Sequence, residues 1–287
     1  MSLKKIVKAI YCIVVKLIPK NDLGDRVFSL IHFVKSYHRF PNDQQLFSNY
    51  LFKIKHNTEG HNSLRAYISD KVFVKNYVTA KVGIHFNVPT LAVLEHFEEA
   101  KSFNFPSRCC IKPTHLSGKV ILQEDSEEID LSVIKKWFRT NQYEIGREKN
   151  YRFLKPKIIV EPLIFNKTNN EDFKFFCYGG KAKFVQIDID RRIKHSRLYF
   201  DREWNEQEFC IKKPKAEKKI DKPKNFDSML KLADCLSKDF EFIRVDLYTN
   251  GNEIYVGELT NWPENGNGYF VPRKSEIIAS RLLFNNV

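Results

Sequence analysis

The sequence has little of the cysteine chemistry that marks a metal-binding or disulfide-stabilised protein. Its six Cys form no CxxC pair and no Cys/His spacing of a zinc site. No signal-peptide cleavage pattern follows the first residues, so we expect a cytoplasmic protein in a reducing compartment. The GxxxxGK(S/T) loop is missing, and neither His115 nor His195 has partners at the spacing of a Ser-His-Asp triad or a metal site. These absences argue against a structural zinc site, a disulfide scaffold and a P-loop.

Acidic side chains and a long apolar run are both missing from the first twenty residues. Residues 1–20 hold five Lys, and their longest apolar run, Ala9–Val15, has seven residues, whereas a membrane span needs about twenty. On a helical projection the Lys side chains fall within one arc of about 160°, opposite the aliphatic ones. This pattern predicts an amphipathic helix on an anionic membrane, which would place the protein peripherally on the inner face of the cytoplasmic membrane. The alternative is a helix packed on the protein's own core.

The net charge of +13 comes from 48 basic and 35 acidic residues, a balance that often indicates nucleic acid. The excess is uneven, because residues 1–20 and the Lys-rich segment 212–224 each contribute +5 and leave +3 for the other 254 residues. We therefore expect no nucleic-acid partner. Pro214 and Pro223 predict that segment 212–224 is an exposed loop.

Composition and periodicity predict an α+β fold. With 43% hydrophobic and 29% charged residues, the chain can bury a core. Residues 21–65 and 70–82 have helical periodicity, with breaks at Pro41 and at 56–63, and residues 227–238 form an amphipathic pattern. Glycine or asparagine turns at 179–180 and 249–252 predict antiparallel hairpins. The predicted strands are 108–112, 119–123, 157–161, 173–178, 182–190, 242–248 and 253–259.

Two acidic residues lie near the ends of strands that the 249–252 turn joins. Asp246 and Glu258 repel each other unless a cation lies between them, and a hard divalent ion completed by phosphate oxygens suits that position. Arg244, two residues before Asp246, faces the same side of its strand and suits a phosphate or a developing oxyanion. The alternative is a surface ion pair on a hairpin.

Other charged side chains accompany apolar strands. Lys112 ends a strand beside the turn Thr114–Gly118, where backbone N–H groups can cradle phosphate. Lys174 lies within the aromatic strand FKFFC, where a lone buried ammonium is costly, so it should face a cleft or an anion. Asp188 and Asp190 share a strand face and precede a basic run, which predicts a substrate edge or a solvated strand end.

Taken in order, these residues fall into five blocks that resemble the TupA-like ATP-grasp family of bacterial capsule, O-antigen and teichuronopeptide gene clusters. The resemblance implies an ATP-grasp fold in which two α+β subdomains clasp ATP behind a helical N-terminal region. We accordingly expect an amphipathic helix at 1–20, a mostly helical region at 21–100, a subdomain with a phosphate lid at 101–165 and a subdomain with a metal-binding hairpin at 166–287. The matching blocks are 69–83, 109–122, 155–164, 172–191 and 242–266.

The resemblance also implies a role for each matched position. Lys71 and Lys112 would hold the ATP phosphates, and Lys174 would point into the nucleotide cleft. Arg244, with Lys174, would act on the reacting groups. The lid would contain Ser117 and Gly118, and the adenine hinge would be Glu161, Pro162, Leu163 and Ile164. The metal ligands would be Asp246 and Glu258 with Thr260 or Asn261. The acidic substrate would contact Arg191, Arg192 and Arg197.

Two motifs depart from the family pattern. The lid reads HLSGKV where relatives resemble HGSGG, so it has one glycine. The metal motif, usually Glu-x-Asn, reads Glu258-Leu259-Thr260, with Asn261 one place late. Neither change removes a charged side chain, so we still expect activity.

The implied activity is ATP-dependent carboxylate–amine ligation through an acyl phosphate, with ATP and Mg²⁺ (or Mn²⁺) as cofactors. The carboxylate would belong to a uronic acid of a capsule, O-antigen or other surface glycan, and the amine to an amino acid or amino compound. A glycan kinase or glycosyltransferase of the same pathway is an alternative. A non-catalytic basic module that binds membrane or nucleic acid is another, although the clustering of the charge argues against it.

Overall fold

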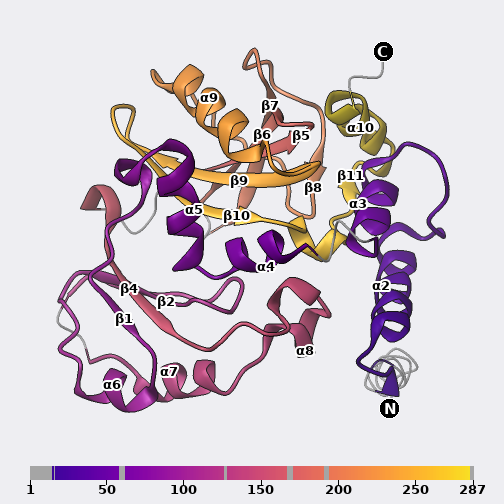
Figure 1. Ribbon diagram of the computed structural model, residues 1–287. Coiled ribbons are helices and arrows are strands. Elements are labelled where there is room, and N and C mark those ends of the chain that lie inside the picture. Colours follow the sequence, from indigo (N-terminus) through magenta and orange to yellow (C-terminus); the bar gives the residue numbers. More distant parts are fainter. Residues whose placement is uncertain are drawn as a thin grey trace.

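The computed structural model describes residue 15 and residues 17–57, 62–125, 128–166, 171–190 and 194–284 (Figure 1). Arg191, Arg192 and most of the predicted helix at 1–20 lie outside these residues. Within the described ranges no helix combines the length and apolarity needed to cross a membrane. The five described cysteines are free thiols.

Helices dominate the N-terminal region, as the periodicity predicts. They are α2 (Asp22–Tyr37), α3 (Phe47–Lys55), α4 (Ser63–Ser69) and α5 (Phe73–Val82). Asn21 and Asn62 cap α2 and α4, since their side-chain oxygens accept from Gly24 N at 2.8 Å and Leu64 N at 2.7 Å. The predicted breaks at Pro41 and after residue 56 are confirmed.

A four-stranded antiparallel sheet follows, in the order β1-β4-β2-β3. Its strands are β1 (Ala92–Leu94), β2 (Cys109–Pro113), β3 (Ile121–Gln123) and β4 (Ile158–Pro162). Helices α6 (Phe97–Ser102) and α7 (Leu131–Phe138) lie along this sheet in Figure 1, and a core that includes Ile111, Ile134 and Val160 joins them to it. The short elements α8 (Gln142–Gly146) and η3 (Lys149–Tyr151) complete this part of the molecule.

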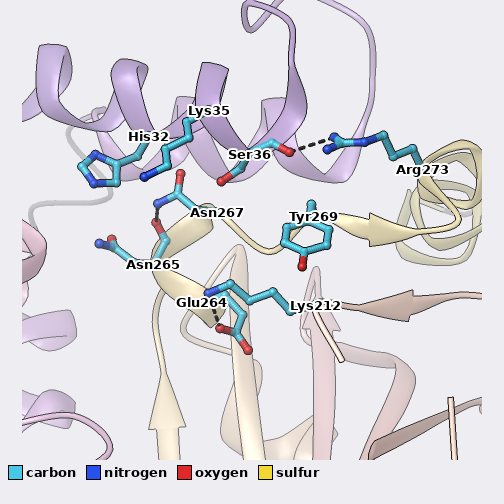
Figure 2. A pocket seen from close by; sticks show the side chains of 9 residues that line it. All are labelled: His32, Lys35, Ser36, Lys212, Glu264, Asn265, Asn267, Tyr269 and Arg273. Atoms are coloured by element: carbon cyan, nitrogen blue, oxygen red, sulfur yellow. Dashed lines mark hydrogen bonds and ion pairs between the residues drawn. The ribbon is translucent and has the colours of Figure 1, made fainter. Parts of the chain in front are cut away.

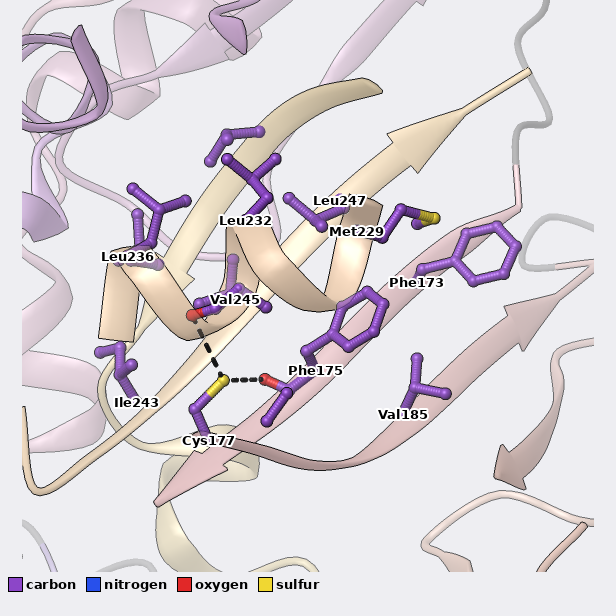
Figure 3. Close-up of a cluster of buried hydrophobic side chains, with 14 of the residues drawn as sticks. Phe173, Phe175, Cys177, Val185, Met229, Leu232, Leu236, Ile243, Val245 and Leu247 are labelled. Atoms are coloured by element: carbon purple, nitrogen blue, oxygen red, sulfur yellow. Dashed lines mark hydrogen bonds between the residues drawn. The ribbon is translucent and has the colours of Figure 1, made fainter. Parts of the chain in front are cut away.

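The larger sheet has five antiparallel strands in the order β10-β9-β5-β6-β7. They are β5 (Asp172–Tyr178), β6 (Lys181–Ile189), β7 (Ser196–Asp201), β9 (Phe242–Thr249) and β10 (Ile254–Thr260). Alternate side chains such as Phe173, Phe175 and Val245 pack against helix α9 (Phe226–Ser237) through Met229 and Leu232 (Figure 3). The predicted turn at Gly179-Gly180 is confirmed, and both glycines have positive φ.

The opposite face of this sheet is apolar at one end and charged at the other. At the apolar end, α3 and α10 (Glu276–Phe284) cover Phe176 and Phe242 in a second core. The predicted loop at 212–224 contains no helix or strand and is mostly exposed. The remaining elements are β8 (Cys210–Ile211), β11 (Phe270–Val271), η2 (Ile84–Phe86), η4 (Ile164–Asn166), η5 (Pro263–Gly266) and η6 (Arg273–Ser275).

Candidate active site

A row of charged side chains crosses the open face of the five-stranded sheet. We call it the charged row: Asp172 and Lys174 on β5, Asp188 on β6, Arg244 and Asp246 on β9, and Glu258 on β10. The antiparallel register places Lys174 opposite Asp246, and Asp172 opposite Asp188. On β5, β6 and β9 the side chains that alternate with these residues point into the α9 core, so the strand period brings the charges of those strands to one face. On β10 a register shift before Glu258 brings its carboxylate to the same face.

Lys174 lies among three carboxylates of the charged row. Its Nζ contacts Asp172, and it lies 3.3 Å from Asp188 Oδ2 and 3.5 Å from Asp246 Oδ2. Burial opposes the charge of Lys174, but the three carboxylates outweigh burial and raise its pKa. The ammonium is therefore fixed and charged, as expected for a buried Lys that faces anions.

Arg244 joins the two carboxylates that the sequence proposes as metal ligands. Its Nε and Nη2 donate to Asp246 at 2.6 Å each, and the same Nη2 donates to Glu258 Oε1 at 3.1 Å. Asp246 and Glu258 are direct partners in the β9–β10 register. The predicted cluster of Arg244, Asp246 and Glu258 is present on one face.

The two carboxyl groups differ in their electrostatic surroundings. Burial raises the pKa of Asp246 to about 6, although Arg244 and Lys174 oppose the rise. Burial also acts to raise the pKa of Glu258, but Arg244 and Lys71 outweigh it and lower that pKa to about 2. Glu258 is thus a permanent anion, whereas Asp246 depends on its cationic neighbours.

The smaller sheet contributes a second ionic cluster, built on Glu161 of β4. Lys112 Nζ lies 2.7 Å from Glu161 Oε2, and Lys75 Nζ, from α5, lies 2.5 Å from Oε1. Burial acts to raise the pKa of Glu161, but the two lysines lower it overall. Of the other predicted hinge residues, Pro162 ends β4, Leu163 is buried and Ile164 begins η4.

Lys71 lies between the two clusters. Burial lowers its pKa, and the carboxylates that oppose this effect are Glu258 of the larger sheet, Asp70, and Glu161 of the smaller sheet. Its Nζ donates to Leu116 O at 2.5 Å, which ties it to the loop after β2. In that loop Thr114–Leu116 are buried and Ser117–Val120 are exposed. The predicted lid residues Ser117 and Gly118 therefore lie at the exposed tip of a loop with an anchored base.

The structure separates the two candidates for the third metal ligand. Thr260 Oγ1 donates to Glu258 Oε1 at 2.6 Å and accepts from Arg244 at 3.0 Å. Asn261 points the other way, donating to Arg65 O at 3.1 Å and accepting from Arg65 Nη1 at 3.0 Å. Only Thr260 is placed with the charged row.

Arg197, predicted to meet an acidic substrate, is buried in the protein. Its Nε donates to Asp188 Oδ1 at 2.7 Å, and its Nη2 donates to Glu264 Oε1 at 2.9 Å. The guanidinium thus forms ion pairs with two internal carboxylates at the edge of the charged row. The other two predicted arginines, Arg191 and Arg192, lie outside the described residues.

Most of the chain matches the model of a known protein family. The model of the family described as TupA-like ATPgrasp matches residues 51–281. The chain belongs to the TupA-like ATP-grasp family. That range contains both ionic clusters and both sheets, so the family's fold encloses the whole candidate site.

Solved structures similar to this TupA-like chain are distant relatives in sequence. D-alanine–D-alanine ligase from Bacillus anthracis is 18% identical, with a TM-score of 0.44 over 75% of this chain and 64% of that one. The ligase complexed with ATP is 14% identical, with a TM-score of 0.39 over 69% and 56%. L-amino acid ligase from Bacillus licheniformis is 12% identical, with a TM-score of 0.46 over 81% and 54%. The chain spans about half to two thirds of these proteins, and no curated protein matches it.

The residues of this TupA-like site suit a divalent cation held together with phosphate. One Arg244 nitrogen occupies the position between Asp246 and Glu258, so a positive charge is already accommodated there. Among the described residues no three His, Cys, Asp or Glu side chains form a ready-made metal site. Two carboxylates with a nearby hydroxyl fit Mg²⁺, which commonly takes one or two protein carboxylates and fills its shell with phosphate oxygens and water.

Sequence reasoning missed two members of the TupA-like site. Lys75 follows Lys71 by four residues within the segment 70–82 of helical periodicity, a spacing that predicts one face, although α5 itself begins at Phe73. Asp172 precedes Lys174 by two residues in a strand, which likewise places both on one face. The spacing of each pair could have predicted these residues, but neither Lys75 nor Asp172 belongs to a recognisable motif.

Proposed function

We propose that the protein is an ATP-dependent carboxylate–amine ligase. The proposal rests on the position of the Arg244 guanidinium. It donates to Asp246 and Glu258, which are opposite each other in the register, and it shares Asp246 with the buried cation Lys174. Membership of the ATP-grasp family supports ATP as the nucleotide. The Arg244 guanidinium supplies the kind of donor that stabilises phosphate and a developing oxyanion.

The proposed reaction has two steps. A carboxylate oxygen of the substrate attacks the γ-phosphorus of ATP, and the bond to the β-phosphate oxygen breaks, giving an acyl phosphate and ADP. An amine nitrogen then attacks the acyl carbon, inorganic phosphate leaves, and the nitrogen loses a proton to give the amide. Catalysis would consist mainly of positioning and charge neutralisation.

Each charged side chain has a part in this scheme. Lys71 and Lys112 bind phosphate oxygens, and Glu161 holds Lys112 in place. Arg244 orients the reacting carboxylate and stabilises the oxyanion, and Lys174 keeps Asp246 ionised. Asp246 and Glu258, with Thr260 beside them, hold Mg²⁺ or Mn²⁺, which when bound supplies positive charge to the phosphates.

We further propose that the carboxylate belongs to a uronic acid of a bacterial surface glycan and the amine to an amino acid or amino compound. The family resemblance to capsule and O-antigen gene products supports this substrate class. The clustered positive charge of residues 1–20 supports action beside an anionic membrane surface.

Thermal unfolding with and without Mg-ATP tests nucleotide binding. We expect Mg-ATP to raise the Tm of the wild-type protein, and Asp246→Asn and Glu258→Gln to abolish the rise. Asp227→Asn is the matched control, because this carboxylate lies on α9 with a side chain that is 79% exposed. A wild-type protein that ignores Mg-ATP yet binds DNA with a steep salt dependence would contradict the proposal.

Product analysis separates a ligase from a kinase. With galacturonic acid and a mixture of amino acids, a ligase releases phosphate in an amine-dependent manner and forms an amide. A stable phosphorylated sugar, formed without amine and not consumed when amine is added, would contradict ligation. Mass spectrometry of the producing cell's surface glycan, with and without the protein, would then identify both natural substrates.

A further inference from the structure

A cavity of about 410 Å³ lies between α2 and the segment that follows β10 (Figure 2). Helix α2 contributes His32, Lys35 and Ser36 to one wall, and residues 264–269 form the wall that faces it. Lys212 and Arg273 complete the rim. A cavity of this size is within the range of small-molecule sites, and none of the residues assigned to ATP, metal or the reacting carboxylate lines it.

Positive charge predominates in this cavity, which we call the α2 pocket. Lys35, Lys212 and Arg273 line it, against the single carboxylate of Glu264. That carboxylate is already compensated, since Arg197 and Lys212 each approach it to 2.9 Å. The pocket therefore favours an anion. Asn267, Tyr269 and Ser36 add hydrogen-bonding groups of the kind that bind sugar hydroxyls.

The walls of the α2 pocket are held together by hydrogen bonds. Tyr37 OH donates to Gly266 O at 3.3 Å and to Gly268 O at 3.1 Å, which joins α2 to the facing wall. Arg273 Nη1 donates to Ser36 O at 2.8 Å across the rim. Glu264 is a non-glycine residue with a φ of 53°, a conformation that costs energy and often accompanies function. The pocket is thus formed in advance of any ligand.

Ion pairs connect the α2 pocket to the charged row. Glu264 pairs with Arg197, Arg197 with Asp188, and Asp188 with Lys174. Arg197 is in register with Asp188, Asp172 and Tyr248, whereas Arg244 lies four residues before Tyr248 on β9. The backbones of Arg197 and Arg244 therefore lie about 20 Å apart, at three strand spacings of about 4.8 Å across the sheet and four residues of about 3.4 Å along it. That distance exceeds one sugar ring, so a substrate that reaches both ends has several units.

We propose that the α2 pocket binds an anionic sugar unit, carrying carboxylate or phosphate, of the same substrate whose carboxylate reacts beside Arg244. This inference rests on the proposed ligase function and makes it more specific. The substrate is then an extended anionic glycan or a sugar diphosphate, and a free monosaccharide occupies only part of the site.

Binding of three probes to the full chain, measured by isothermal titration calorimetry, tests the pocket. Trigalacturonic acid presents carboxylates, UDP-glucuronic acid presents phosphates, and maltotriose is a neutral trisaccharide. Lys35→Glu, alone and with Arg273→Glu, reverses charge at exposed positions of the rim. Lys231→Glu makes the same change at an exposed position on α9, which covers the other face of the sheet, and is the matched control.

We expect the wild-type protein to bind at least one anionic probe more tightly than maltotriose. The double variant should weaken that binding by about tenfold or more, because it reverses two positive charges that attract the anion, while Lys231→Glu should not. Loss confined to trigalacturonic acid identifies a carboxylate site, and loss confined to UDP-glucuronic acid identifies a phosphate site. Equal binding of maltotriose, no binding of either anion, or anion binding unchanged in both rim variants would overturn the proposal.

The rise in Tm with Mg-ATP, measured on the same variants, keeps this inference separate from the proposed function. We expect all rim variants to retain the wild-type rise. If the wild-type protein shows no rise but the rim variants lose anion binding, the ligase proposal fails and the anion site stands.

Discussion

At the residue scale, Glu148 is a buried carboxyl group, and its burial disfavours the ionised form. It follows α8, and the charges that act on it include those of Lys55 and Glu258. Burial raises its pKa to about 7, although Lys55 and a hydrogen bond from Gln142 oppose the rise. Because the ordinary value is 4.5, the native protein binds a proton at Glu148 more tightly than the unfolded chain does.

Glu148 should therefore destabilise the protein as the pH rises. The native state holds the extra proton between about pH 4.5 and 7, so this group's contribution to the free energy of unfolding falls through that window. Glu148→Gln removes the ionisation, and its stability relative to wild type should rise by about 3 kcal/mol between pH 4.5 and 8. Urea unfolding at both pH values measures this change.

Glu144→Gln is the control for that experiment, because Glu144 lies four residues before Glu148 and its side chain is 55% exposed. Its stability relative to wild type should change little between the two pH values. Parallel pH profiles for wild type and Glu148→Gln would contradict the prediction.

At the scale of elements, a bulge in β10 decides which side chains face the metal site. The register shifts between Val256 and Glu258, at Gly257. Before the bulge Ile254 and Val256 point into the α9 core, and after it Leu259 does. The residues that point inward are therefore even-numbered before the bulge and odd-numbered after it. A Cβ at Gly257 would lie 2.6 Å from Tyr248, which favours glycine there.

After the bulge, Thr260 faces Glu258 and Arg244 whereas Asn261 faces Arg65, which predicts separate roles for the two side chains. Asn261→Ala removes one of the acceptors of the buried Arg65 and should lower the free energy of unfolding by about 2–3 kcal/mol, while the rise in Tm with Mg-ATP persists. Thr260→Val should do the reverse, weakening Mg-ATP binding with little loss of stability. Urea unfolding and thermal shift measure the two effects. Loss of the Mg-ATP response in Asn261→Ala alone would contradict this assignment.

Strand periodicity explains how much of the site could be predicted. Lys174 and Asp246 stand in long apolar runs, where the period of two assigns each side chain a face. Glu258 faces the charged row only because of the bulge at Gly257. Arg197 stands in the short strand β7, directly after a basic run, and periodicity alone gave no strand there. Its neighbours Leu198 and Phe200 are buried on the α9 side, which turns Arg197 toward Asp188. The choice between Thr260 and Asn261 depends on the bulge, which the sequence pattern does not locate.

At the scale of the whole molecule, the N-terminal chain is attached to the body of the protein just before α2. The segment that enters α2 is fixed to the body by Arg147, which donates to Ile18 O at 2.7 Å and Pro19 O at 2.9 Å and pairs with Asp25 at 3.0 Å. Arg147 itself is buried. A truncation that keeps residues 17–20 therefore preserves this attachment.

Removal of residues 1–14 should release the protein from anionic vesicles. We expect the full chain to sediment with phosphatidylglycerol vesicles and not with phosphatidylcholine vesicles, since the segment carries three of the five N-terminal Lys. The truncated protein should remain in the supernatant. Lys218→Glu with Lys219→Glu, in the exposed loop, is the matched charge control. Continued sedimentation of the truncated protein would exclude the segment as the anchor.

The contact between α3 and α10 has a consequence for biosynthesis. Phe47 N donates to Ser280 Oγ across 233 residues of sequence, and Ser48 N donates to Glu276 Oε1 across 228. At roughly 5–20 residues per second, the ribosome delivers α10 about 10–50 seconds after α3. Phe47, Leu51 and Ile54 have no α10 to pack against during that interval, so the nascent chain presents an apolar helix face that a ribosome-associated chaperone would shield.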